Sequence, residues 1–210
     1  MTTVGVLGLQ GDFAAHLAAL SGAGIGARRV MRPCDLDGLG GLIIPGGEST
    51  TLLMLLEAGG FMDELVAFLR RGGALLGTCA GAILLARAVT HPAQPSLGLI
   101  DIEVERNAYG RQKESFEQAH GDLAPGGLEG GPGPAGAPPE HMEMIFIRAP
   151  RIRACGPSVK VLASREGEPV LVSQGRVMAC TFHPELTRDR RVHRAFAALA
   201  DRRSTAGAGS

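Results

Sequence analysis

The sequence predicts an α/β fold in which a mostly parallel sheet carries helices on both faces. Short apolar runs rich in β-branched residues alternate with longer segments of helical periodicity through the first half of the chain. Glycines stand at most of the joints between these segments. Because sites in such sheets form at the carboxyl ends of strands, the residues that follow each predicted strand are the first candidates for function.

Five elements of this kind come first in the chain, and a short strand is predicted after them over residues 74–76. Residues 3–9 and 41–47 are apolar runs that predict strands. Residues 13–24, 48–60 and 61–73 carry apolar side chains at helical spacing and predict helices. The last of these ends in two arginines and two glycines, as is typical of a helix C-terminus.

The second half predicts shorter strands and a final helix. Residues 97–107 alternate apolar and charged side chains, which indicates a strand with one solvated face. Short strands with glycine-containing turns follow, and residues 188–203 predict a basic amphipathic helix. Residues 121–140 are rich in glycine and proline, so we expect a flexible surface insert there. One domain over 1–203 and a disordered tail over 204–210 are therefore expected.

Composition and charge narrow the classes of function. The 210 residues contain 21 Lys and Arg against 21 Asp and Glu, and this balance predicts no attraction to nucleic acid or to an anionic membrane. The N-terminal segment lacks the basic region of a signal peptide, and no apolar run approaches the ~20 residues of a membrane helix. We expect a cytoplasmic protein that contacts neither membranes nor nucleic acid.

The cysteines and glycine motifs indicate neither a metal nor a cofactor. No C-x-x-C pair and no metal-ligand spacing occurs, so free thiols in a reducing compartment are expected. No Walker loop is present and no G-x-G-x-x-G follows a predicted strand, which predicts that the chain binds no phosphorylated substrate. The cysteines are Cys34, Cys79, Cys155 and Cys180.

Cys79 stands between two glycines where a predicted strand gives way to a helix. The segment Gly77-Thr78-Cys79-Ala80-Gly81 has the form of a nucleophile elbow, in which small neighbours let a strained turn hold the thiol clear of the sheet. The positive end of the following helix would favour the thiolate, and the Ala80 amide could donate to an oxyanion. The alternative is a buried cysteine in a glycine-rich turn.

A nucleophilic cysteine needs a base and an orienting group, and His183 with Glu185 is the best-placed pair. His183 ends an apolar strand, and an i, i+2 pair in extended chain can point to the same side. The alternative is a strand-to-helix turn whose glutamate favours the next helix. We expect His16 to be structural or at an interface, and His193 lies on the basic helix. The remaining histidines lie in a loop or border the insert; they are His91, His120 and His141.

Several segments in a fixed order extend this pattern. "GTCAGAILLA" and "TFHPEL" resemble the class I, triad-type glutamine amidotransferases. "GVLGLQGDFAAH", "IIPGGESTT", "LGLIDIEVERNAYGRQKESFE" and "FIRAP" narrow the resemblance to the glutaminase subunits of pyridoxal 5′-phosphate synthase. The resemblance covers about residues 3–200 apart from the insert. It implies a three-layer, flavodoxin-like fold with an antiparallel extension of the sheet.

The resemblance also implies a role for each matching residue. Cys79 resembles the nucleophile, His183 the base and Glu185 the orienting acid of a Cys-His-Glu triad. The positions that match glutamine-binding segments are Gly47, Glu48, Ser49, Arg106, Ile147 and Arg148. The positions that match the oxyanion region are Gln10, Gly11, Gly47 and Ala80.

Local chemistry offers another interpretation for several of these residues. Glycines before Ser49 expose backbone N–H groups to a polar ligand, but Ser49 also suits a helix N-cap. Arg106 can bind a carboxylate through two hydrogen bonds, but it can also pair with Glu103 or Glu105 on the surface. The "QGD" segment can be a turn with Asp12 as N-cap, and "FIRAP" an edge strand that proline stops.

The resemblance implies hydrolysis of L-glutamine to glutamate and ammonia. The ammonia would pass to a synthase subunit, a barrel in a hetero-oligomer with this chain, which builds pyridoxal 5′-phosphate (vitamin B6). Three alternatives stay open: a glutaminase for another acceptor, such as imidazole glycerol phosphate formation; a cysteine peptidase or other hydrolase on the same fold; and a non-catalytic binding or regulatory module.

Overall fold

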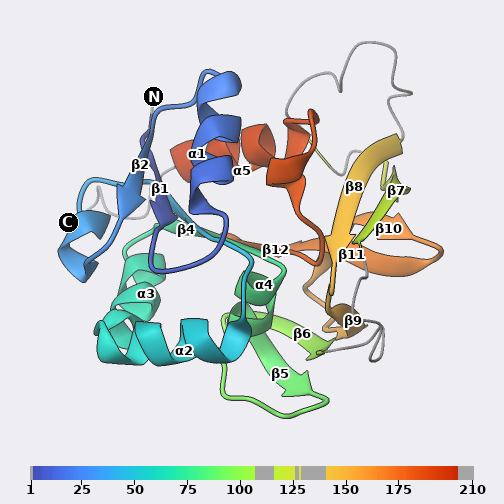
Figure 1. Ribbon diagram of the computed structural model, residues 1–210, viewed down its shortest axis with the longest axis horizontal. Coiled ribbons are helices and arrows are strands. Elements are labelled where there is room, and N and C mark those ends of the chain that lie inside the picture. The colour runs from blue at the N-terminus through green and yellow to red at the C-terminus, as the bar shows by residue number, and fades with distance from the viewer. Residues whose placement is uncertain (1, 107–115, 126–127, 129–140, 203–210) are drawn as a thin grey trace.

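The computed structural model describes residues 2–106, 116–125, 128 and 141–202, and its centre is a nine-stranded sheet (Figure 1). The strand order is β2-β1-β3-β4-β12-β11-β10-β7-β8. The first five strands in this order pair in parallel, as predicted for the first half of the chain. They are β2 (Ala27–Val30), β1 (Val4–Leu7), β3 (Gly41–Ile44), β4 (Ala74–Thr78) and β12 (Val177–Cys180).

The other four strands form the expected antiparallel extension. They are β11 (Glu168–Gln174), β10 (Lys160–Arg165), β7 (Phe116–Leu123) and β8 (His141–Ile147). A separate small sheet contains β5 (Ala86–Thr90), β6 (Ile100–Glu105) and β9 (Arg151–Cys155). Burial alternates along β6 as the sequence predicted, because Ile100, Ile102 and Val104 face the core.

The boundary of the insert differs from the prediction. Strand β7 continues through Leu123, so residues 121–123 of the segment expected to be structureless belong to the sheet. Pairing with β8 explains the difference, because Gly121 lies opposite Met142 in this ladder. The ladder hydrogen bonds pair backbone groups that the glycine-rich composition alone predicted to be exposed to solvent. Most of the remaining insert and the tail predicted over 204–210 lie outside the described residues.

Helices cover both faces of the sheet, which confirms the predicted layers (Figure 1). On one face lie α1 (Phe13–Gly22) and α5 (Arg191–Asp201). On the other lie α2 (Ser49–Ala58), α3 (Phe61–Arg70) and the short α4 (Ala80–Leu85). Two 3-10 turns complete the elements: η1 (Pro33–Leu36) and η2 (Pro184–Leu186).

The central strands are buried on both sides because their side chains alternate between two cores. In β3, Leu42 and Ile44 join the core under α2 and α3, whereas Ile43 joins the core under α1 and α5. In β4, Leu75 and Leu76 divide in the same way. Apolar runs without polar alternation are what a doubly covered parallel strand requires. Among the described residues, no helix combines the length and hydropathy needed to cross a membrane.

Candidate active site

Cys79 lies at the joint between β4 and α4 in a backbone conformation that few non-glycine residues adopt. Its φ is 49°, in the left-handed region, where strain costs of order 1–3 kcal/mol. The flanking glycines permit the turn: a Cβ on Gly81 would lie 2.1 Å from the Ile44 carbonyl oxygen, and one on Gly77 would lie 2.5 Å from the Gly81 carbonyl. The turn therefore has the form that the two glycines predicted.

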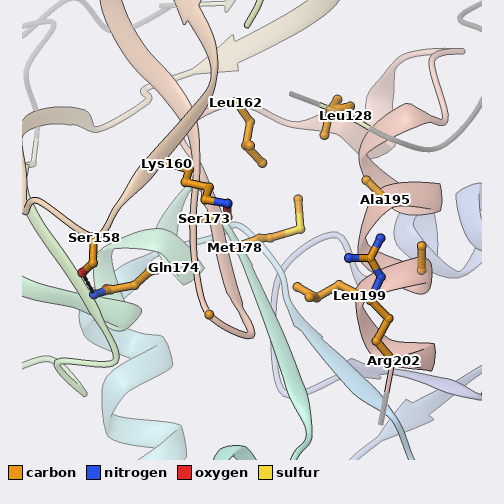
Figure 2. Close-up of a pocket in the computed structure, with 12 residues that line it drawn as sticks. Leu128, Ser158, Lys160, Leu162, Ser173, Gln174, Met178, Ala195, Leu199 and Arg202 are labelled. Carbon is orange, nitrogen blue, oxygen red and sulfur yellow. Dashed lines mark hydrogen bonds between the residues drawn. The ribbon is translucent and has the colours of Figure 1, made fainter. Parts of the chain in front are cut away.

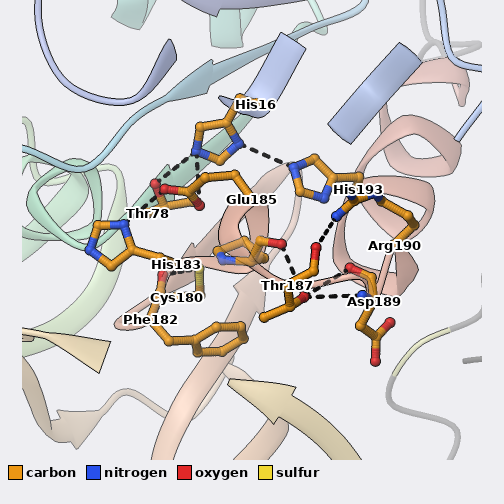
Figure 3. Close-up of polar contacts among 11 residues, drawn as sticks. His16, Thr78, Cys180, Phe182, His183, Glu185, Thr187, Asp189, Arg190 and His193 are labelled. Carbon is orange, nitrogen blue, oxygen red and sulfur yellow. Dashed lines mark hydrogen bonds and ion pairs between the residues drawn. The ribbon is translucent and has the colours of Figure 1, made fainter. Parts of the chain in front are cut away.

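His183 and Glu185 form a buried pair directly after β12. His183 Nδ1 lies 2.8 Å from Glu185 Oε1, and both residues are 5 % exposed (Figure 3). His183 Nε2 makes no hydrogen bond to any described residue. Burial disfavours the imidazolium, but the neighbouring Cys79 and Glu185 outweigh burial and raise the pKa of His183 to about 10. The His183 imidazole therefore tends to hold a proton beside the Cys79 thiol.

Two loops pack over this pair so closely that only glycine fits. A Cβ on Gly46, which follows β3, would lie 2.6 Å from His183 Cε1 and 3.2 Å from Cys79 Cβ. Gly11, which follows β1, has a φ of 82°, and a Cβ there would lie 1.8 Å from the Gly46 carbonyl oxygen. The predicted oxyanion segment at Gln10 and Gly11 is therefore stacked on the glycine loop beside the triad.

Glu48 caps helix α2, where the sequence suggested Ser49. The Glu48 carboxylate accepts hydrogen bonds from the backbone N–H groups of Thr50 at 3.0 Å and Thr51 at 2.7 Å. Burial would raise the pKa of Glu48, but these donors outweigh it and lower the pKa to about 2. The Ser49 hydroxyl instead donates to Gln94 Oε1 at 3.0 Å. The N-cap interpretation of Ser49 is wrong, because the longer side chain of Glu48 accepts the hydrogen bonds of the free amides.

Arg106 extends from the end of β6 to this cap. Its Nη2 donates to Thr50 Oγ1 at 3.2 Å and lies 3.6 Å from Glu48 Oε1. The proposed surface pair with Glu105 is not formed, because Glu105 pairs with Arg153 on the adjacent strand β9. The Arg106 side chain is 12 % exposed, and it faces the pocket that Cys79 lines.

A pocket of about 100 Å³ brings half of the predicted residues together, while His183, Glu185, Gln10, Gly11 and Ala80 are outside its lining. It is lined by Cys79, the glycine loop, the α2 cap and two arginines, and Ile83 and Pro150 complete it. Its predicted members are Gly47, Glu48, Ser49, Cys79, Arg106 and Arg148. Ile147 is not in the lining, although its carbonyl oxygen lies 3.9 Å from Cys79 Sγ. Arg148 has a φ of 42°, a second strained residue at the rim.

A larger cavity, of about 370 Å³, lies between the β10–β12 strands and α5 (Figure 2). Lys160 and Arg202 stand at its edge, and apolar side chains such as Met178 and Leu199 line it. None of the candidate catalytic residues reaches this cavity. We assign the site to the smaller pocket, because it contains Cys79 and the groups that can bind a charged substrate.

Asp12, together with His183 and Glu185, could offer ligand atoms to a cation. Asp12, His183 and Glu185 present donor atoms within 4.8 Å of one another. A metal there would have to displace the His183–Glu185 hydrogen bond and a proton that the raised pKa of His183 holds. The arrangement favours acid–base chemistry. Asp12 stands at the N-cap of α1, but its side chain makes no capping hydrogen bond.

One residue beside His183 and Glu185 was not among the site residues predicted from the sequence. His16, expected to be structural or at an interface, is fully buried and its Nε2 lies 3.3 Å from Glu185 Oε2. Helical periodicity places His16 on the inner face of α1, but no local pattern indicates which buried group it meets. The contact joins residues 169 positions apart (185 − 16) and arises only from packing α1 against η2.

Comparison with known proteins identifies the family. A model of the SNO glutamine amidotransferase family matches residues 6–200. The chain is 50 % identical over 203 residues to the pyridoxal 5′-phosphate synthase subunit PdxT of Solibacter usitatus, an alignment that covers 93 % of this chain and 98 % of that protein. It is 51 % identical over 207 residues to PdxT of Deinococcus radiodurans, covering 96 % and 99 %.

Solved structures agree with this result. A crystal structure of a glutamine amidotransferase superposes with a TM-score of 0.82 at 46 % identity, covering 94 % of this chain and 98 % of that one. PurLQS from Thermotoga maritima gives a TM-score of 0.72 at 16 % identity over 94 % and 99 % of the two chains, a likeness of fold alone. The resemblance seen in the sequence motifs is confirmed: the chain belongs to the SNO glutamine amidotransferase family.

Proposed function

We propose that this glutaminase hydrolyses L-glutamine through a Cys79–His183–Glu185 triad and passes the ammonia to a partner synthase subunit. The observation that carries the proposal is the buried His183–Glu185 pair, which lies beside a strained cysteine at a pocket lined by arginine. A thiol, an imidazole and an orienting carboxylate are the three groups that covalent hydrolysis of an amide needs.

In the first half of the reaction, the Cys79 thiolate attacks the carboxamide carbon of glutamine. Backbone N–H groups of Ala80 and Gly47 stabilise the tetrahedral oxyanion, and the Gln10–Gly11 segment completes the pocket. His183 then gives its proton to the departing nitrogen, and ammonia leaves a γ-glutamyl thioester on Cys79. The raised pKa of His183 supports this role, because the imidazole holds a proton at neutral pH.

In the second half, His183 removes a proton from water, which attacks the thioester and releases glutamate. Glu185 stabilises the imidazolium in both halves and fixes the ring through Nδ1. The thiol regains its proton when the thioester is cleaved. One water is consumed, and one glutamate and one ammonia are released in each cycle.

The pocket residues account for recognition of a free amino acid. Arg106 is the candidate for the glutamine carboxylate, because a guanidinium binds a carboxylate through paired hydrogen bonds. Glu48, Ser49 and Arg148 surround the remaining polar groups, and Ile147 contacts the side-chain amide from the direction of its carbonyl oxygen. The two arginines in the lining suit a small substrate that carries a carboxylate.

The names of the relatives support a specific acceptor. They are subunits of pyridoxal 5′-phosphate synthase, so we propose that the ammonia serves that synthesis in a hetero-oligomer. The alternatives of another acceptor and of a non-catalytic module have no comparable support. Hydrolysis without an acceptor for the ammonia would waste glutamine, so we predict low activity until the partner binds.

The test is ammonia release from L-glutamine by the purified chain, with and without the synthase subunit from the same genome. Stimulation by the synthase, with loss in Cys79→Ala, is the predicted result. Full activity without the synthase would contradict the predicted dependence on the partner. Release that persists in Cys79→Ala would exclude Cys79 as the nucleophile.

A further inference from the structure

His16 is a fully buried histidine that the triad chemistry above does not use. Its ring lies on α1 and faces polar groups from three other elements (Figure 3). Nε2 is 3.2 Å from Thr78 Oγ1 and 3.3 Å from Glu185 Oε2, while Nδ1 is 3.1 Å from His193 Nε2. Two ring nitrogens thus meet three polar partners, one of which is the orienting acid of the triad.

Both histidines of this cluster are neutral at physiological pH. Burial, followed by repulsion from His193 and His183, holds the pKa of His16 well below its ordinary value. Burial and then Arg190 lower the pKa of His193 to about 4, against a smaller opposing effect of Asp189. Each ring therefore carries a single N–H, and the position of that hydrogen decides what the ring can do.

Glu185 Oε2 determines the tautomer of His16. This oxygen is buried and accepts no recorded hydrogen bond from a described residue, although His16 Nε2 is 3.3 Å away, and an ionised carboxylate only accepts. With the hydrogen on Nδ1, the lone pair of Nε2 would face the carboxylate at 3.3 Å, an unfavourable contact of two acceptors. With the hydrogen on Nε2, the ring donates toward Thr78 and Glu185, and Nδ1 accepts from His193 Nε2–H.

We propose that His16 is a positioning residue for Glu185: its Nε2–H holds the carboxylate oxygen that His183 does not use, and His193 fixes the required tautomer. The inference rests on the proposed function. Glu185 then has one oxygen toward each histidine, so the carboxylate cannot turn away from His183. Because His16 is neutral, it orients the carboxylate without neutralising the charge that supports the His183 imidazolium.

The first test compares His16→Leu, His16→Gln and Leu20→Ala in the complex with the synthase subunit. Leu20 is fully buried one turn further along α1, so its truncation loosens the same helix without touching Glu185. For His16→Leu we expect about a tenfold loss in kcat with KM nearly unchanged, the size expected for a hydrogen bond to a charged group. His16→Gln should recover most of kcat, because its amide can donate from a similar place.

The pH profile separates positioning from general destabilisation. Glu185 helps to raise the pKa of His183, so a misplaced carboxylate should move the basic limb of kcat/KM to lower pH in His16→Leu. Leu20→Ala should leave that limb in place. Equal kcat losses and unchanged limbs in both variants would overturn the proposal and leave His16 as a packing residue.

A spectroscopic readout keeps the proposal testable if His16→Leu fails to fold. Nitrogen-15 chemical shifts of the wild-type chain should show His16 protonated at Nε2 and bare at Nδ1 at pH 7; the reverse tautomer would overturn the proposal. The proposed function and the role of His16 are overturned by different results. A wild-type complex without ammonia release overturns the proposed function and this inference with it, whereas an active wild type and an unaffected His16→Leu overturn this inference alone.

Discussion

The two sides of the pocket are built in different ways. On the chemical side, Cys79, His183 and Glu185 are at most 6 % exposed, and glycines at Gly46 and Gly81 let neighbouring backbone close against them. On the recognition side, Glu48 accepts from backbone amides of its own helix α2, Arg106 donates to Thr50 of that helix, and the two side chains are 57 % and 12 % exposed.

This difference indicates which property each side supplies. Close packing fixes atoms to within a fraction of an ångström, which proton transfer requires. Hydrogen bonds at a partly exposed rim permit adjustment, which suits capture and release of a polar substrate. Changes on the chemical side should therefore lower kcat, and changes on the recognition side should raise KM.

The largest effect is expected from Glu185→Gln. The amide nearly preserves the shape of the side chain but removes the charge that supports the His183 imidazolium and can reverse the ring tautomer. We expect kcat to fall by roughly 10³–10⁴-fold with little change in KM. Steady-state ammonia release with the synthase present would measure it, and a loss below tenfold would show that Glu185 is not the orienting acid.

Gly46→Ala tests the close packing itself. The added methyl would lie 2.6 Å from His183 Cε1 and 3.2 Å from Cys79 Cβ, so the imidazole must move. A displacement of about 1 Å can cost about 100-fold in rate, and we expect a loss of that order in kcat. Gly26→Ala is the matched control, because Gly26, like Gly46, lacks a positive φ, and a Cβ there meets nothing within 4 Å. Similar kinetics of the two variants would contradict the packing argument.

Arg106→Met should act on KM. Methionine keeps an unbranched chain but removes the guanidinium that we assign to the substrate carboxylate. We expect KM for L-glutamine to rise about 10- to 100-fold, with kcat within a few-fold of wild type, from initial rates over a wide substrate range. A large fall in kcat at constant KM would place Arg106 on the chemical side and would contradict the difference between the two sides of the pocket.

The smallest effect is expected from the α2 cap. In the fold the pKa of Glu48 is lowered to about 2, so its contribution to stability is present above its ordinary pKa of 4.5 and is lost as pH falls through about 2. Glu48→Ala should lower the free energy of unfolding by about 1 kcal/mol at pH 7 and by less near pH 2. Denaturant unfolding at both pH values measures this, and a cost that grows toward low pH would contradict the assignment.

Most of the fold and the members of the proposed triad followed from local patterns in the sequence. The strand-to-helix joint at Cys79 could be predicted because a tight turn requires glycine on both sides. The His183–Glu185 pair could be predicted because both residues follow one strand. Apolar runs without alternation predicted strands covered on both faces. These signals act over a few residues, where backbone sterics and periodicity dominate.

The remaining features depend on contacts between distant segments. Glu48 rather than Ser49 caps α2, because the geometry of the preceding glycine loop decides which side chain reaches the amides. His16 meets His193 across 177 positions, and no spacing in the chain encodes that contact. The end of β7 at Leu123 depends on pairing with β8, which overrides the glycine-rich composition.

The central claim is that Cys79 is the nucleophile that attacks glutamine, and covalent labelling tests it most directly. The complex would be incubated with a diazoketone analogue of L-glutamine, and the labelled cysteine would be located by peptide mass spectrometry. Exposed Cys34 and buried Cys180 serve as internal controls for reactivity and access. We predict label on Cys79 alone, prevented by excess L-glutamine and absent in Cys79→Ala. Label confined to Cys34, or undiminished in Cys79→Ala, would contradict the account.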